Sequence, residues 1–277
     1  MLFEFDPTRD EHAYFLGLLA TDGSITAASR NRGRVTFELG AIDAPVLSAL
    51  AKVMPYSGSL SSRRRTTNFC QSYESAILRF CDLRLRRQLH DWGYPSGKKS
   101  DTVGPPQCEY DESGFWRGVL DGDGSMGVTA NDRAFVSLVT ASELMRNAYI
   151  DFVAKITGAQ PNPTRNTRDD VFNIVLFDEK AQWLVNHLYA DDLVAIPRKL
   201  SAAKSVARWR RPEGRTRIGF ERRKWTADQD RRVLSDLSLG AIATELARTV
   251  QAVNVRRWRL RASLQKLSPA LTTDSTS

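Results

Sequence analysis

The chain has 277 residues, 42% of them hydrophobic, which suffices for two or three domains with buried cores. Forty Lys and Arg against 32 Asp and Glu give a formal net charge of +8, which favours a polyanionic partner such as nucleic acid. Neither a long apolar run nor a basic leader followed by an apolar segment is present. We therefore expect no membrane span and no signal peptide, and an intracellular location, cytoplasmic or associated with the nucleoid.

Cysteine and histidine are too few and too scattered for several kinds of site. The cysteines form no Cys-x-x-Cys pair, and the histidines stand far apart; these residues are Cys70, Cys81, Cys108, His12, His90 and His187. This spacing argues against a disulfide framework, a zinc finger and histidine-based zinc catalysis.

The charge is unevenly distributed along the chain. Residues 201–277 contain 17 Lys and Arg against 7 Asp and Glu, whereas residues 1–200 contain 23 against 25. The C-terminal part is therefore predicted to contact an anionic partner, although solvated surface charge remains the simpler alternative.

In chain order, the first hundred residues predict a helix, two strands, a second helix and two more strands. Thr8 and Glu11 have the spacing of a capping box at the start of the first helix, which is expected to end at Asp22 with Gly23 as a left-handed cap. The following predicted elements are strands at 24–30 and 34–41, a helix at 44–54, and strands at 58–64 and 67–73.

The next hundred residues predict the same succession of elements. They are a helix at 113–123, strands at 125–130 and 134–140, a helix at 142–157, strands at 160–165 and 171–177, and a helix at 178–189. Because the connections between strands are short, the sheets are expected to be antiparallel and the fold class α+β.

A short internal repeat supports this duplication. The segments Gly17–Ile25 and Gly118–Met126 share five of nine residues at an offset of 101. Lys99 and Lys199, each following a proline-containing turn, repeat at an offset of 100. Two repeats in the same register predict two copies of a unit of about a hundred residues.

Beyond the repeats, the chain changes character. Residues 204–223 are basic, contain Gly and Pro, and are predicted to form a linker, which is followed by a compact helical module at 224–265 and a disordered tail at 266–277. The expected organisation is thus a first unit at 1–105 and a second at 106–203, followed by these three segments.

The segments Phe15–Gly23 and Trp116–Gly124 resemble the two motifs of a monomeric LAGLIDADG homing endonuclease, and the resemblance extends over residues 8–203. It implies two αββαββα units that form a saddle of antiparallel sheets, and a monomer that acts on double-stranded DNA as a pseudo-dimer. The first motif departs from the family with Ala20 where aspartate is usual, whereas the second keeps Asp121 there.

The same resemblance implies a site. The family's catalytic acids correspond to Asp22 and Asp123, and its basic residues near the catalytic water correspond to Lys99 and Lys199. The acids, with the backbone carbonyls of Thr21 and Gly122, would bind divalent metal, Mg²⁺ or Mn²⁺. Since most lysines are solvated surface residues, that reading of the two lysines stays open.

Physical arguments point to the same place. Gly17 and Gly118 lie inside predicted helices, where glycine costs about 1 kcal/mol relative to alanine, so close packing of the two helices is expected. That packing would bring Asp22 and Asp123 together at helix C-termini, where the carboxylates repel and a divalent cation relieves the repulsion.

Two alternatives compete for the aspartates. An Asp-Gly-Ser sequence after a helix is often only a turn, although its duplication favours a site. A calcium-binding loop starting at Asp121 is excluded, because Met126 and Asp132 stand where glycine and glutamate are required.

The predicted strands offer a surface that fits the major groove of DNA. The candidate DNA-binding arginines are Arg30, Arg32, Arg34, Arg63, Arg64 and Arg65 in the first unit and Arg133, Arg165 and Arg168 in the second. Candidate polar readers of base edges are Thr26, Asn68, Gln71, Asn131 and Asn173. Any one arginine can instead position a phosphate or be merely solvated. Because the first unit is the more basic, a long, asymmetric site is expected.

The module at 224–265 resembles a Myb-like helix-turn-helix domain. Its last helix is expected to start after Thr249 as N-cap and to present Arg256, Arg257 and Arg259 to DNA, while Trp225 is expected in the core. A protein-binding role for the module stays open.

The leading hypothesis is a site-specific double-strand DNA endonuclease that hydrolyses phosphodiester bonds with divalent metal. The alternative is a non-cleaving DNA-binding transcription regulator or a maturase built on the same scaffold. A phosphoester enzyme for small substrates is disfavoured, because the chain lacks a Gly-rich phosphate loop.

Overall fold

The computed structural model describes residues 4–67, 70–166, 168–213 and 225–267. The chain divides into two compact units, residues 1–213 and 214–277. In the described residues, no helix is both long and apolar enough to cross a bilayer.

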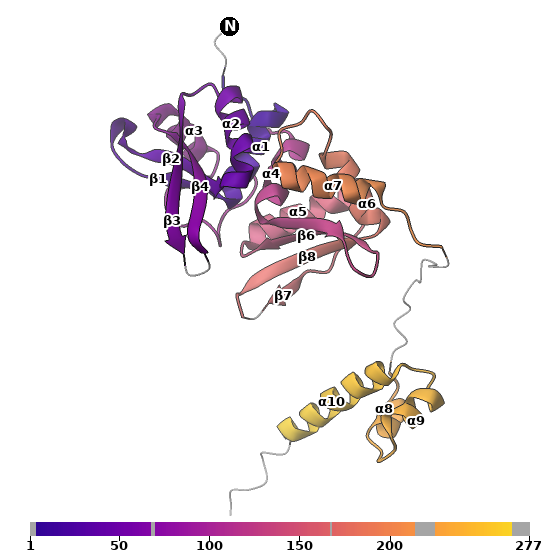
Figure 1. The fold of residues 1–277 in the computed structure, drawn as a ribbon. Helices are drawn as coiled ribbons and strands as arrows, with labels where there is room; N and C mark the ends of the chain where they lie inside the picture. Colours follow the sequence, from indigo (N-terminus) through magenta and orange to yellow (C-terminus); the bar gives the residue numbers. More distant parts are fainter. Residues whose placement is uncertain (1–3, 68–69, 167, 214–224, 268–277) are drawn as a thin grey trace, which may run out of the picture. The chain divides into compact units, whose positions relative to one another are not determined.

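The first unit contains two copies of one arrangement (Figure 1). The first copy consists of α1 (Asp10–Thr21), β1 (Gly23–Thr26), β2 (Arg34–Gly40), α2 (Ala44–Val53), β3 (Gly58–Thr67), β4 (Cys70–Phe80) and α3 (Leu83–Asp91), with single 3-10 turns η1 (Arg30–Arg32) and η2 (Ala41–Asp43). Its four strands form an antiparallel sheet in the order β1-β2-β4-β3.

The second copy repeats these elements in the same order. It consists of α4 (Glu112–Asp123), β5 (Gly124–Val128), β6 (Ala134–Thr140), α5 (Glu143–Thr157), β7 (Thr164–Asn166), β8 (Val171–Phe177) and α6 (Glu179–Leu188), followed by α7 (Pro197–Arg208). Its sheet has the equivalent order β5-β6-β8-β7 and is also antiparallel. The predicted α+β class with two antiparallel sheets is confirmed.

Each sheet is apolar on one face and packs its helices there. On β2, for example, Val35, Phe37 and Leu39 are buried, and the residues between them are not. This alternation is the period-2 pattern of a strand with one covered face. In Figure 1 the first sheet lies to the left of the central helices α1 and α4, and the second sheet lies below them.

The central helices meet through glycine. A Cβ on Gly17 would lie 2.9 Å from the Val119 backbone nitrogen, and one on Gly118 would lie 2.8 Å from that of Leu18. These distances leave no room for a side chain, so the backbones of α1 and α4 are in direct contact. The helix cost of each glycine is thus offset by close packing.

Two local expectations at the ends of α1 are wrong. The N-cap is Arg9 rather than Thr8, whose hydroxyl donates instead to the Asp6 carboxylate at 2.7 Å, so the capping box does not form. Gly23 is not a left-handed cap but the first residue of β1; a Cβ there would lie 2.8 Å from the Cα of Leu19. Crowding, and not backbone conformation, requires glycine at this position.

The expected linker begins too early at 204. Helix α7 continues to Arg208, and Val206 and Trp209 are buried in the core of residues 1–213. The Trp209 indole also donates to the Asp132 carbonyl at 3.2 Å. Residues 204–209 therefore belong to the folded unit, and residues 214–224 lie outside the described part of the chain.

The described part of the second unit consists of three helices, α8 (Ala227–Val233), α9 (Leu239–Glu245) and α10 (Val250–Leu267). The side chains of Thr226, Ser238 and Thr249 accept a backbone N–H near the start of each. Val233, Ile242, Ala243 and Val253 form a small core against which Trp225 packs. Since α10 extends to Leu267, residues 266 and 267 are helical and not part of the predicted tail, and residues 268–277 lie outside the described part of the chain.

Candidate active site at the paired helix ends

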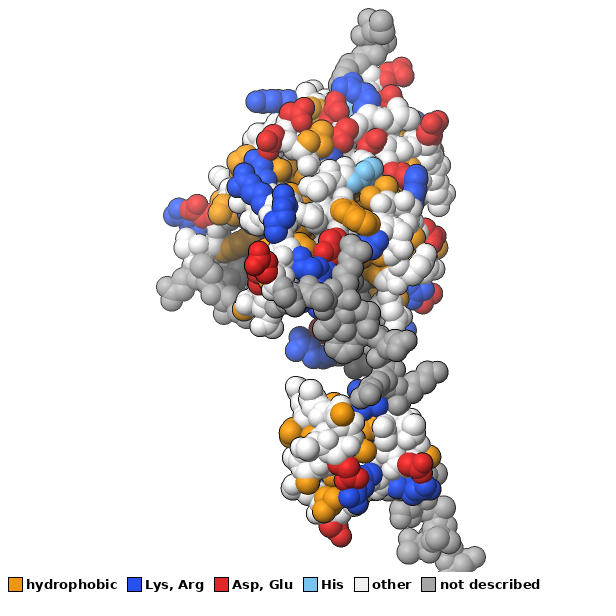
Figure 2. Space-filling model, turned by 90° about the vertical axis from the view of Figure 1, so that its right-hand side faces the viewer, with side chains coloured by type: hydrophobic (Ala, Val, Ile, Leu, Met, Phe, Trp, Pro, Cys, Tyr) orange, Lys and Arg blue, Asp and Glu red, His pale blue; other side chains and the backbone are white. Residues whose placement is uncertain are grey.

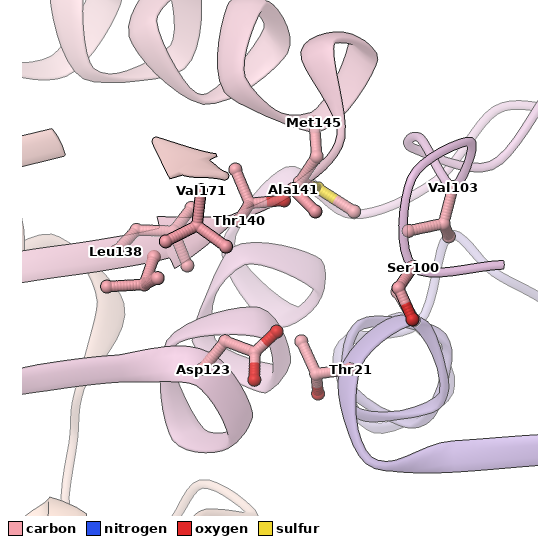
Figure 3. Close-up of a pocket in the computed structure, with 11 residues that line it drawn as sticks. Thr21, Ser100, Val103, Asp123, Leu138, Thr140, Ala141, Met145 and Val171 are labelled. Atoms are coloured by element: carbon pink, nitrogen blue, oxygen red, sulfur yellow. The ribbon is translucent and has the colours of Figure 1, made fainter. Parts of the chain in front are cut away.

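The contact between α1 and α4 brings the two candidate acids to one place. Asp22 is the C-cap of α1, and Asp123 is the last residue of α4. A Cβ on Gly122 would lie 2.8 Å from Asp22 Oδ2, so the Asp22 carboxylate touches the residue before Asp123. In Figure 3 the side chains of Thr21 and Asp123 approach each other from opposite halves. The hydroxyl of Thr21 donates to the Leu18 carbonyl at 3.1 Å.

The surroundings of the acids resist their ionisation. Partial burial raises the pKa of Asp123 to about 6, and the nearby Asp22 carboxylate adds to this effect. Partial burial also raises the pKa of Asp22, although Lys199 and Lys99 oppose the shift. Both side chains still reach solvent. Two carboxylates with raised pKa values at neighbouring helix C-termini form a site that gains from a bound cation.

Lys99 and Lys199 are buried next to the helix ends that carry the two acids. Lys99 Nζ donates to the Ala20 carbonyl at 3.0 Å, at the end of α1. Lys199 Nζ donates to the Leu120 carbonyl at 3.3 Å, at the end of α4, and to the Gly124 carbonyl. Each residue is only 7% exposed, which contradicts the alternative of solvated loop lysines.

Burial and charge act in opposite directions on these two lysines. Burial lowers the pKa of both lysines, and the carboxylates of Asp22 and Asp123 partly restore that of Lys99. Cations that bind the last carbonyls of a helix also compensate its negative end. Each half therefore pairs one helix-end acid with one buried lysine.

The donors at the helix ends suit a hard divalent cation. The described residues contain no cluster of three or more His, Cys, Asp or Glu that would form a complete metal cage. The two carboxylates, with the backbone carbonyls of Thr21 and Gly122 at the same helix ends, provide oxygen alone. Mg²⁺ favours such incomplete oxygen sites, because it retains several waters.

A pocket of about 250 Å³ opens beside Asp123. Thr21, Ser100, Asp123 and Thr140 give it polar walls, and Leu138, Met145 and Val171 lie on its apolar side (Figure 3). The pocket lies between Asp123 and the central strands β6 and β8 of the second sheet.

Sequence reasoning missed the role of Asp121. This carboxylate is fully buried and accepts hydrogen bonds from the Tyr14 hydroxyl at 2.7 Å, the Tyr189 hydroxyl at 2.8 Å and the Ile196 backbone N–H at 2.6 Å. Burial raises its pKa, and the three donors oppose the shift. Because Ile196 is the N-cap of α7, Asp121 fixes the start of the helix that carries Lys199.

A second residue on α7 reaches across to the first half. Arg198 Nε lies 3.0 Å from Asp43 Oδ2, and the Asp43 side chain is almost fully buried at the start of α2. The Arg198 charge also lowers the pKa of Asp22. Arg198 thus links the start of α7, which carries Lys199, to α2 of the first half, close to the acids.

The arginines of the first sheet divide between its two faces. Arg34, Arg63 and Arg65 lie on the face away from the helices, as their register with Thr26, Ser75 and Tyr73 shows. Arg63 and Arg65 lie 4.0 and 3.5 Å from the Glu38 carboxylate on the same face.

Two further arginines, one on β3 and one on β4, lie on faces that the sequence did not predict. Arg64 points to the opposite face and forms an ion pair with Glu74. Arg79, which sequence reasoning omitted, belongs to the outward face, because it stands in register with Thr36 and Ser59. The alternation along β4 was the signal that would have found it.

Arg30 and Arg32 lie exposed in the turn η1 between β1 and β2. Arg86 of α3 holds this turn, donating to the Ala28 carbonyl at 3.1 Å and to that of Arg30. Arg30 itself has a positive φ of 51°. The turn is therefore held at its base while its two arginine side chains face outward.

The candidate arginines of the second half are all engaged with acids. Arg133 lies 2.9 Å from Asp178, Arg165 lies 2.6 Å from Asp170, and Arg168 lies 3.0 Å from Asp169. On the side that carries α6 and α7, Figure 2 likewise shows basic and acidic side chains close together. On α7, Lys204 forms an ion pair with Asp191 at 2.7 Å. These arginines carry little unopposed positive charge.

The structure describes the side chains of three of the five candidate polar readers of base edges. Asn68 and the side chain of Gln71 lie outside the described part of the chain. Thr26 lies exposed at the end of β1, Asn131 in the loop between β5 and β6, and Asn173 in the middle of β8.

In the second unit, two of the three predicted arginines support the fold itself. Arg256 forms an ion pair with Asp230 at 2.6 Å, and Arg257 donates to the Val233 carbonyl at 2.7 Å and to that of Leu237 at 2.9 Å. Arg259 is exposed. The outward side of α10 also presents Gln251, Asn254 and Trp258, the last 70% exposed.

No family model matches the sequence, and no curated protein matches it. Solved structures do match. The homing endonuclease I-WcaI bound to its DNA recognition sequence is 14% identical, with 71% of this chain and 87% of that one covered and a TM-score of 0.51.

Two further matches have lower TM-scores. They are mesophilic variants of the homing endonuclease I-DmoI (13% identity, 72% and 99% coverage, TM-score 0.48) and I-SmaMI bound to an uncleaved DNA target in the presence of calcium ions (9%, 66% and 85%, 0.43). Over the 71% of the chain that the I-WcaI match covers, this protein shares the fold of a LAGLIDADG homing endonuclease.

Proposed function

We propose that the chain is a site-specific double-strand DNA endonuclease that hydrolyses one phosphodiester bond on each strand with the help of divalent metal. The observation that carries this proposal is the meeting of Asp22 and Asp123 at the ends of two helices packed through glycine. Two equivalent acids, each with its own lysine, match the two strands of a duplex, which are themselves related by a two-fold axis.

The residues have distinct tasks in this proposal. Asp22 and Asp123, with the carbonyls of Thr21 and Gly122, would hold Mg²⁺ or Mn²⁺, which when bound would supply positive charge at the scissile phosphate and help to activate water as the nucleophile. Lys99 and Lys199 hold the helix ends in place, and their ammonium groups partly offset the rise in the pKa of the acids that burial causes. Together they place positive charge where the phosphorane develops negative charge.

The outward faces of the two sheets would contact the duplex on either side of the acids. The first contributes Arg34, Arg63, Arg65 and Arg79 from its strands, and Arg30 and Arg32 from its turn. A single chain thereby acts as a pseudo-dimer, and an intracellular location follows from a DNA substrate. Affinity is expected to fall steeply with salt.

For the C-terminal unit we propose a helix-turn-helix role in which α10 enters a groove of DNA. The internal bonds of Arg256 and Arg257 shift the expected contact surface to Gln251, Asn254, Trp258 and Arg259. Such a module would extend the bound site or raise the effective concentration of the nuclease on DNA.

The test is cleavage of a DNA library by the purified chain with Mg²⁺, followed by sequencing of the new ends. We expect double-strand breaks at one long asymmetric sequence, and none with a variant that carries both Asp22→Asn and Asp123→Asn. Binding of a sequence that the wild-type chain never cuts would instead identify the non-cleaving regulator or maturase.

A further inference from the structure

The outward faces of the two sheets differ in chemistry at equivalent positions. The offset of 101 that relates Asp22 to Asp123 also relates Arg34 to Phe135 and Glu38 to Val139. Arg79 stands in register with Thr36, and Val175 stands in register with Ser137, the equivalent of Thr36. Three charged residues of the first sheet are therefore replaced by apolar residues in the second.

The second face carries no charged residue, neither Lys, Arg, Asp nor Glu, at its described strand positions, and some of its apolar side chains are accessible. Val139 is 38% exposed and Phe177, in register with Phe135, is 40% exposed. Arg133 lies at the edge of this face, where its guanidinium stacks 4.2 Å from the centre of the Phe177 ring and pairs with Asp178. Arg165 stands in register with inward-facing Phe172 and pairs with Asp170.

One polar group on this face lacks a partner. Asn173 stands between Val139 on β6 and Thr164 on β7, and its side-chain oxygen Oδ1 is buried without a hydrogen-bond donor. A buried acceptor without a partner is unfavourable, and rotation of the Asn173 amide towards a bound molecule that donates to Oδ1 removes the penalty. The neighbours of Asn173 therefore favour a ligand with both a donor and an apolar group.

An A·T base pair offers that combination in the major groove. Adenine presents the N6 donor next to the N7 acceptor, which suits a side-chain amide, and thymine presents its C5-methyl group, which suits valine or phenylalanine. Arginine instead pairs with guanine O6 and N7. Because the acid pair lies between the two sheets, a duplex whose strands reach both acids continues over this second face.

Resting on the proposed endonuclease function, we propose that the second sheet recognises an A·T-rich half-site and the first sheet a guanine-containing one. In the second half-site, Asn173 binds adenine, and Phe135, Val139, Val175 and Phe177 contact thymine methyl groups. Specificity in this half depends on apolar contact and one amide, and charge contributes mainly in the other half.

The first experiment selects duplexes from a random library with the full-length chain, using Ca²⁺ in place of Mg²⁺ to keep bound DNA intact. The selected site is then made with deoxyuridine in place of thymidine, one half at a time, which removes only the methyl groups. We expect a loss of affinity of about fourfold per contacted methyl in the A·T-rich half and little change in the other.

The second experiment assigns each half-site to its sheet. Asn173→Ala is expected to weaken binding about tenfold and to relax the adenine preference in one half only. Arg79→Ala, on the equivalent face of the first sheet, is the matched control and is expected to relax guanine preference in the other half only.

The outcomes separate this inference from the function on which it rests. Selected sites with guanine and cytosine in the half that Asn173→Ala affects, insensitivity to deoxyuridine, or an Asn173→Ala variant with unchanged selection would overturn the inference and leave the endonuclease intact. The last result would point to a protein partner for this face. Failure to select any duplex would overturn both.

Discussion

Tyr14 of the first half donates a hydrogen bond of 2.7 Å to Asp121 of the second half, and the pseudo-symmetric positions cannot make it. The equivalent of Tyr14 is Phe115, and the equivalent of Asp121 is Ala20. A polar pair on one side of the α1–α4 contact is thus matched by an apolar pair on the other. The missing aspartate of the first motif and the extra hydroxyl at Tyr14 belong to the same asymmetry.

This bond predicts the effect of removing one hydroxyl. Tyr14→Phe is expected to lower the free energy of unfolding by about 1–2 kcal/mol, because the buried Asp121 carboxylate loses one of its three donors. Urea unfolding measures it. Tyr56→Phe, which removes a half-buried hydroxyl bonded to Gln88, is the control and should cost less. Equal losses in the two variants would contradict the role given to Asp121.

The glycine contact predicts a larger effect. Gly118→Ala should destabilise residues 1–213 by roughly 2 kcal/mol or more, because the new methyl group overlaps the backbone of α1 and the helices must separate. Gly40→Ala is the control, since its nearest neighbour would be the Tyr73 hydroxyl at 3.5 Å. Thermal unfolding of the two variants decides, and a Gly118→Ala chain as stable as Gly40→Ala would refute direct backbone contact.

The raised pKa of Asp123 predicts a dependence of stability on pH. Its folded-state pKa of about 6 lies above the ordinary 3.8, so the folded protein binds the proton more tightly. That contribution is fully present below pH 3.8 and is lost as the pH rises to about 6. Without metal, Asp123→Asn should therefore stabilise the chain at neutral pH, by about 1 kcal/mol after solvent screening.

Metal reverses this dependence. Mg²⁺ needs the ionised carboxylate. At pH values above the Asp123 pKa of about 6, added Mg²⁺ should therefore raise the melting temperature, and at pH values well below it, Mg²⁺ should have little effect. The rate of cleavage should decrease as the pH is lowered through the same range. Melting curves with EDTA or Mg²⁺ across this range measure it, and equal stabilisation of the double Asp22→Asn, Asp123→Asn variant would exclude these acids as ligands.

The separate C-terminal unit predicts a separable contribution to binding. Residues 1–213 have their own core, so removal of residues 214–277 should leave cleavage at the same position. Affinity should fall, and its dependence on salt should become shallower as basic residues are lost. Binding titrations at several salt concentrations measure this, and an unchanged salt dependence would argue for a protein partner of the module.

The duplicated units and the meeting of the acids could be predicted because each depends on a local pattern. The repeated Asp-Gly-Ser at Asp22 and Asp123 defines the register, and mid-helix Gly17 and Gly118 require close packing. The partners of Asp121 could not be predicted. Tyr14 and Ile196 are 107 and 75 residues away, and no pattern links such separations.

The sequence also could not show which arginines are available to bind DNA. Sequence places Arg63, Arg64 and Arg65 together, but strand alternation sends Arg64 to the other face, where Glu74 pairs with it. Arg256 and Arg257 are likewise taken up by Asp230 and by backbone carbonyls that only the folded module brings near. Residue type indicates a capacity to bind DNA, whereas the three-dimensional neighbours decide whether it is available.

The central claim is that one acid serves each strand from a shared centre, and strand-resolved cleavage tests it most directly. The selected site, with each strand labelled separately, is incubated with Mg²⁺ and the wild-type, Asp22→Asn or Asp123→Asn chain. We predict cleavage of both strands by the wild type, and loss of at least one strand's cleavage in each variant, with binding retained. Unchanged cleavage of both strands by either variant would contradict the account.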